Sequence, residues 1–157
     1  MRFAIIQIVL ASLLAVILLI GCDDHGLSPL ETPVITGQVH FAGSMPEHIQ
    51  YCFVVVALDR PPGDALDLSY LGNYYEVPDS VLPTIADTTI EFQVYIGRGT
   101  YNWVFVAAIG NEDSVSISNV IGEYIAEGDT IPTSVTIEWD DSLWIEIDAD
   151  LTTAQIP

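Results

Sequence analysis

Basic side chains are almost absent from this sequence. It contains no lysine, and three arginines stand against 22 aspartate and glutamate residues, which gives a formal net charge of −19 at pH 7. All the acidic residues follow position 22, where Arg60 and Arg98 are the only basic groups. Because like charges repel, this balance excludes nucleic acid and anionic lipid as partners. It fits simple solubility, a salty medium that screens self-repulsion, or cation binding.

Cysteine is equally scarce, and Cys22 and Cys52 are the only two. If Cys22 is modified, no intrachain disulfide can form. Cys52 lies within an apolar strand pattern, which favours a buried free thiol that packs as a small hydrophobe over a reactive nucleophile.

Catalytic signatures are missing too. No Gly-x-Ser-x-Gly elbow surrounds a serine, and the histidines show no metal-ligand spacing such as His-x-x-x-His. His25 precedes the patterned region, and the simplest interpretation of His40 and His48 is two solvated imidazoles, with a metal site that adds an acidic partner as the alternative. We expect a protein that is not an enzyme and that holds no cofactor or metal.

The first 21 residues have the layout of a secretion signal. A positive end, Met1-Arg2, precedes an apolar run from Phe3 to Ile20. The run ends in Leu19-Ile20-Gly21-Cys22, which resembles the bacterial lipobox, and the chain then turns polar. We expect a lipoprotein signal peptide over residues 1–21 and lipidation of Cys22. An apolar run of about 18 residues is also long enough for a membrane helix, so an uncleaved anchor is an alternative, as is plain secretion.

Lipid on Cys22 predicts attachment to a membrane of the bacterial cell envelope. Two or three acyl chains anchor stably, at about 0.8 kcal/mol per buried CH₂ group, whereas one chain binds only marginally. Residues 22–33 then form the lipidated cysteine and a polar tether that reaches at most about 36 Å. Asp23 resembles a signal for retention at the inner membrane in some bacteria, and the choice between inner and outer membrane stays open.

Residues 34–157 show a hydrophobic period of two. Apolar and polar side chains alternate over 35–41, 90–96 and 143–151, as in strands with one buried and one solvated face. No apolar stripe of helical period exceeds two turns, and glycine and proline turns separate the runs. The pattern predicts an all-β fold: a single antiparallel two-sheet β-sandwich of about seven strands with Greek-key connections, after the N-terminal signal helix.

Other segments complete this prediction. Residues 51–58 and 101–109 are apolar at odd and even positions alike, as expected of central strands covered on both sides. Val135, Ile137 and Trp139 predict a short strand. The long connections 59–87 and 110–133 are places where binding tends to occur, although either has room for an edge strand or a short helix.

Aromatic residues are the first candidate binding group. Exposed rings stack on sugars or anchor a protein partner, whereas rings packed beneath a loop form a satellite core. Both interpretations apply to a cluster in the first long connection and to two residues expected to point outward from their strands: Tyr70, Tyr74 and Tyr75, and Tyr95 and Trp144.

Acidic residues near the C-terminus are the second candidate binding group. Asp148 and Asp150 project from one face with Glu146 in line, after a turn at Asp140-Asp141. Such carboxylates suit a hard cation such as Ca²⁺, although the spacing of a calcium-binding loop is absent. The alternative is a solvated acidic strand face that discourages edge pairing.

Two motifs resemble the carboxypeptidase regulatory-like, or transthyretin-like, β-sandwich domains. They are Ile35-Thr36-Gly37-Gln38-Val39-His40-Phe41, followed by Gly43 and Pro46, and Gly99-Thr100-Tyr101, which leads into a strand ending Ala107-Ala108-Ile109-Gly110. In the second motif the tyrosine can bury its ring while its hydroxyl bonds back to the loop. The resemblance covers residues 34–151 in outline and implies a structural or binding module.

The expected function combines these observations. We expect a lipid-anchored cell-envelope protein whose non-catalytic β-sandwich gives structure or binds a protein or carbohydrate partner. The alternative is a Ca²⁺-responsive accessory envelope lipoprotein that uses its acidic surface.

Overall fold

The computed structural model describes residues 31–46, 49–60, 73–110 and 116–154. These residues form β-strands joined by turns and short 3-10 helices. Within them no helix is long and apolar enough to cross a membrane. The predicted signal peptide, Cys22, His25, His48 and Tyr70 lie outside the described residues.

The first sheet contains three strands in the order β4 (Thr89–Tyr95), β1 (Val34–Ala42) and β9 (Ser142–Asp150). Buried and more exposed residues alternate along β1 and β9, as the sequence predicts. β1 pairs with β4 antiparallel but with β9 parallel, so the prediction of a purely antiparallel sandwich is wrong. Parallel neighbours need a long connection, and β1 and β9 satisfy this because they are the first and last strands described.

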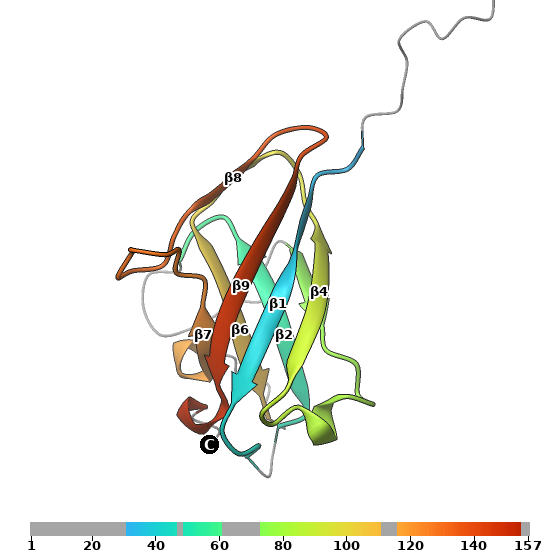
Figure 1. The fold of residues 1–157 in the computed structure, drawn as a ribbon, viewed down its shortest axis with the longest axis vertical. Helices are drawn as coiled ribbons and strands as arrows, with labels where there is room; N and C mark the ends of the chain where they lie inside the picture. Colours follow the sequence, from blue (N-terminus) through green and yellow to red (C-terminus); the bar gives the residue numbers. More distant parts are fainter. Residues whose placement is uncertain (1–30, 47–48, 61–72, 111–115, 155–157) are drawn as a thin grey trace, which may run out of the picture. The chain divides into compact units, whose positions relative to one another are not determined.

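The second sheet contains four antiparallel strands in the order β3 (Asn73–Glu76), β2 (Tyr51–Ala57), β6 (Trp103–Ile109) and β7 (Val120–Glu123). A separate ribbon pairs β5 (Gly99–Tyr101) with β8 (Val135–Ile137). Figure 1 shows β9, β1 and β4 lying over β6 and β2, the two layers of a sandwich. The described residues thus hold nine strands, more than the seven expected, because β3 and β5 are too short to show an alternation.

The central strands are buried on both faces. Val54, Val56 and Val106 face the main core between the sheets, while Val55 and Phe105 belong to a second apolar cluster on the opposite face of the same sheet. This confirms the interpretation of the doubly apolar segments. The second long connection supplies an edge strand, β7, preceded by a 3-10 helix, η3 (Ile117–Asn119), and the first supplies β3 and a 3-10 helix, η2 (Leu82–Thr84).

A glycine in β1 has a steric cause. A Cβ atom at Gly37 would overlap with the backbone carbonyl of Ile145 in β9 and press on the ring of Phe92 in β4. Gly37 pairs with both of these residues in the sheet. The missing side chain therefore lets the three strands approach and leaves room for the Phe92 ring in the core.

Candidate functional site

The outer face of the β4-β1-β9 sheet carries two exposed aromatic rings. Trp144 is 53% exposed and Tyr95 is 61% exposed, which confirms that both point outward. The strand register places Thr36 opposite Gln93 on one side and opposite Trp144 on the other. We call Thr36, Gln93, Tyr95 and Trp144 the aromatic face. Its residues come from three strands, so the sheet holds their positions relative to one another.

Hydrogen bonds orient the polar groups of the aromatic face. The Gln93 side-chain amide donates to the Tyr95 hydroxyl over 2.9 Å. The Thr36 hydroxyl donates to the backbone carbonyl of Leu143 over a longer distance, 3.4 Å. The hydrogen bond to Tyr95 uses only one N–H of the Gln93 side chain. The other N–H and the side-chain carbonyl of Gln93 therefore remain available to a ligand.

A shallow hollow of about 350 Å³ lies on this face, and Thr36, Glu91, Gln93 and Trp144 contribute to its lining. Tyr75 and Phe92 complete the lining. An indole plane beside an amide, a hydroxyl and a carboxylate offers both a stacking surface and directed hydrogen bonds. This combination suits a neutral ligand rich in hydroxyl groups, or a polar segment of a protein.

The two described tyrosines of the predicted aromatic cluster have different surroundings. Tyr74 is 56% exposed, and its ring meets the ring of Phe53 edge to face with centroids 5.4 Å apart. Tyr75 is partly buried and packs against the main core. Tyr75 therefore packs against the main core and not in a satellite cluster, whereas Tyr74 stays on the surface.

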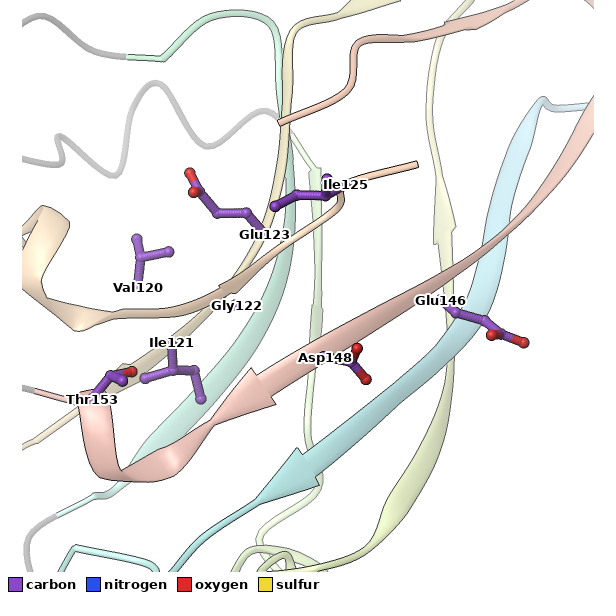
Figure 2. Close-up of a pocket in the computed structure, with 8 residues that line it drawn as sticks. All are labelled: Val120, Ile121, Gly122, Glu123, Ile125, Glu146, Asp148 and Thr153. Atoms are coloured by element: carbon purple, nitrogen blue, oxygen red, sulfur yellow. The ribbon is translucent and has the colours of Figure 1, made fainter. Parts of the chain in front are cut away.

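A second hollow, of about 450 Å³, lies where β7 meets β9. A Cβ atom at Gly122 would overlap with the carbonyl oxygen of Asp148, so the two strands are close there. Figure 2 shows that the carboxylates of Glu123 and Glu146 point in opposite directions, while Asp148 lies between them. These acidic groups line the hollow without converging on one point.

Glu123 has a structural partner. Its carboxylate accepts a hydrogen bond from the Trp103 indole N–H over 2.6 Å and pairs with the Arg60 guanidinium at 3.7 Å. Arg60 also lies over the Trp103 ring, 5.3 Å from its centroid. The sequence shows no local signal for this trio, because its members come from three separate segments.

The acidic residues of the predicted cation site take part in turns. The Asp150 carboxylate accepts hydrogen bonds from the hydroxyl and the backbone N–H of Thr152, which lower the pKa of Asp150. Asp150 thereby caps η4 (Leu151–Thr153). The Asp141 carboxylate accepts the backbone N–H of Glu138. Among the described residues, no three His, Cys, Asp or Glu side chains are placed to share a metal ion.

Cys52 and His40 have ordinary surroundings. Cys52 is 1% exposed, and burial raises the pKa of its thiol to about 12, so the prediction of an unreactive buried thiol is confirmed. His40 lies on β1 with its Nδ1 atom 2.9 Å from the Thr89 hydroxyl. The Thr89 hydroxyl is exposed to solvent, so this contact of His40 is at the protein surface.

Trp139 differs from its expected position. It follows β8 in a turn instead of ending the strand, and it is 47% exposed. The Arg98 guanidinium lies 5.7 Å from the centroid of its ring. The predicted short strand included Val135, Ile137 and Trp139, but the chain turns after Ile137.

No family model matches this chain, and no curated protein or solved structure matches it either. The resemblance to transthyretin-like domains therefore stays a prediction. One local feature behaves as that motif implies: Tyr101 is buried, and its hydroxyl donates to the Gly97 carbonyl over 2.8 Å.

Proposed function

We propose that this chain is a lipid-anchored protein of the bacterial cell envelope whose β-sandwich is a non-catalytic binding module of transthyretin-like, Greek-key type. The aromatic face carries the proposal, because Trp144 and Tyr95 are exposed beside oriented polar groups on a rigid sheet. Large apolar rings in such a setting are costly to leave in water and are typical of recognition surfaces. The leader and the Leu19–Cys22 pattern support the anchor.

The partner that fits the aromatic face best is a neutral carbohydrate. Sugar rings present apolar C–H faces that stack on an indole, while their hydroxyl groups bond to amides and carboxylates such as Gln93 and Glu91. The net charge of the chain, −19, opposes polyanions. A protein partner with a polar, uncharged or basic surface is the other outcome of the test.

Binding of neutral polysaccharides tests this role. We expect the chain to be retarded in gels that contain such a polymer and the Trp144→Ala variant to be retarded less, with an affinity about tenfold lower because one stacking contact contributes up to about 1.5 kcal/mol. Tyr74→Ala is the matched control, since Tyr74 is exposed on the other sheet. If the protein is retained on immobilised envelope proteins but binds none of the polysaccharides, the proposal of a carbohydrate partner is wrong and the partner is a protein.

The anchor has a separate test. We expect the full chain to sediment with membranes and to carry a mass increase of diacylglycerol or triacyl size, and we expect Cys22→Ala to lose both. A Cys22→Ala variant that still sediments after a high-salt wash would show that the leader is an uncleaved helix or that a partner holds the domain.

A further inference from the structure

Hydrogen bonds fix where the chain enters the sandwich. The backbone N–H of Ile96 donates to the Pro33 carbonyl over 3.0 Å, and the Val34 N–H donates to the Asp141 carbonyl over 3.1 Å. The chain therefore enters between the loop after β4 and the turn before β9, at the upper end in Figure 1. The residues from Cys22 to Glu31 span at most about 32 Å even when fully extended.

The entry end also presents an indole and a cation. Trp139 is half-exposed in the turn before β9, and Arg98, in the loop after β4, lies over its ring at 5.7 Å. Arg98 is one of only two basic residues after position 22. A half-exposed tryptophan with a cation at its side matches the chemistry of a membrane–water interface, where indole rings lie among the headgroups and guanidinium groups bind phosphate.

We propose that the entry end rests on a zwitterionic phospholipid bilayer, with Trp139 in the headgroup layer and Arg98 at its phosphates. This inference rests on the proposed lipid anchor, which holds this end nearest to the point of attachment. A lipid chain holds the domain near the membrane, and Trp139 and Arg98 set the orientation that it takes there.

The acidic groups of the entry end favour a zwitterionic lipid over an anionic one. The Asp140 carboxylate accepts the backbone N–H of Glu31 in the entering chain, and the Asp141 carboxylate accepts the backbone N–H of Glu138 in the turn. The side chains of Glu31 and Glu138 are exposed and repel an anionic surface. A zwitterionic headgroup offers phosphate to Arg98 and ammonium to these glutamates, which makes it the matching surface.

This orientation leaves Trp144 accessible to a partner. Trp144 is the third residue of β9 and points outward from the sheet, whereas Trp139 lies in the turn before that strand. A domain that stands on its entry end would present Trp144 to the space beside it and not to the lipid. The membrane contact at Trp139 and the stacking contact at Trp144 therefore use different residues, while Tyr95 lies beside the entering chain at Val34.

Tryptophan quenching by brominated lipid tests the orientation. The chain contains three tryptophans, of which Trp103 is fully buried, so Trp144→Phe leaves Trp139 as the exposed reporter and Trp139→Phe leaves Trp144. The lipidated full chain is reconstituted into phosphatidylcholine vesicles brominated near the ester end of the acyl chains. We expect Trp144→Phe to lose emission relative to unbrominated vesicles, and Trp139→Phe to lose less.

Each result separates the two proposals. Vesicle-bound protein with equal quenching in both variants, or with quenching only in Trp139→Phe, overturns the orientation and leaves the anchor intact. Failure of the full chain to float with the vesicles overturns the anchor, and the orientation with it. Adding Arg98→Gln to the Trp144→Phe protein should weaken the quenching, and an unchanged signal would remove Arg98 from the contact.

Discussion

The two sheets of the sandwich differ on their outer faces. The β4-β1-β9 sheet alternates, and most of its outer side chains are polar, with exposed rings such as Trp144 among them. The β3-β2-β6-β7 sheet carries an apolar cluster on its outer side, and Trp103 and Phe105 there are fully buried. Tryptophan thus has two roles in this protein: Trp103 stabilises the fold, whereas Trp144 is exposed and can contact a partner.

Replacement of the two tryptophans by alanine should separate these roles most clearly. Trp103 stacks on Phe105 with centroids 3.8 Å apart and is fully buried, so we expect Trp103→Ala to lower the free energy of unfolding by about 3–5 kcal/mol. Trp144→Ala, on the exposed face, should change it by less than about 0.5 kcal/mol. Urea denaturation of both variants measures the difference. Equal losses would contradict the contrast between the two outer faces.

A second contrast concerns alkaline pH. Burial in β2 raises the pKa of Cys52 to about 12, so the folded chain keeps the thiol protonated where the unfolded chain ionises it. This contribution is fully present below the ordinary thiol pKa and is lost as pH rises through the folded value. Between about pH 9 and 12 we expect stability to fall by up to about 1.4 kcal/mol per pH unit.

Denaturant titrations of the wild type and Cys52→Ala across this range isolate the thiol. The variant should start less stable and show a shallower alkaline decline. Identical slopes in the two proteins would show that other groups, such as the buried Tyr101, cause the decline.

Glutamates on the two sheets provide the third comparison. Glu123 accepts the Trp103 indole N–H, and its loss leaves that buried donor without its partner, so Glu123→Ala should lower the free energy of unfolding by about 1–3 kcal/mol. Glu146 is exposed on β9, and Glu146→Ala should change stability by less than about 0.5 kcal/mol. Thermal melts of the pair test this difference. A Glu123→Ala melt that matches the wild type would show that water satisfies the indole.

The sequence alone predicted the β-sandwich class, the core-facing side chains of each long strand and the burial of the central strands on both faces. It could do so because the hydrophobic period of a strand shows which of its faces are covered. It was not enough for the parallel pairing of β1 with β9, since pairing direction leaves no mark on alternation. Tyr95 and Trp144 followed from the same period. Their neighbours across the sheet, Thr36 and Gln93, required the strand register, and Trp139 required knowing where β8 ends.

The smallest expected effect concerns the acidic end of β9. Hydrogen bonds from Thr152 lower the pKa of Asp150, so the carboxylate stabilises the fold above its ordinary pKa, and this contribution is lost as pH falls through the lower folded value. Asp150→Asn should therefore be less stable than the wild type at neutral pH, with a difference in Tm that shrinks below about pH 4. Asp148→Asn removes the same charge from the same exposed face. If both variants show the same pH dependence, relief of charge repulsion explains the effect and the cap at Asp150 contributes nothing measurable.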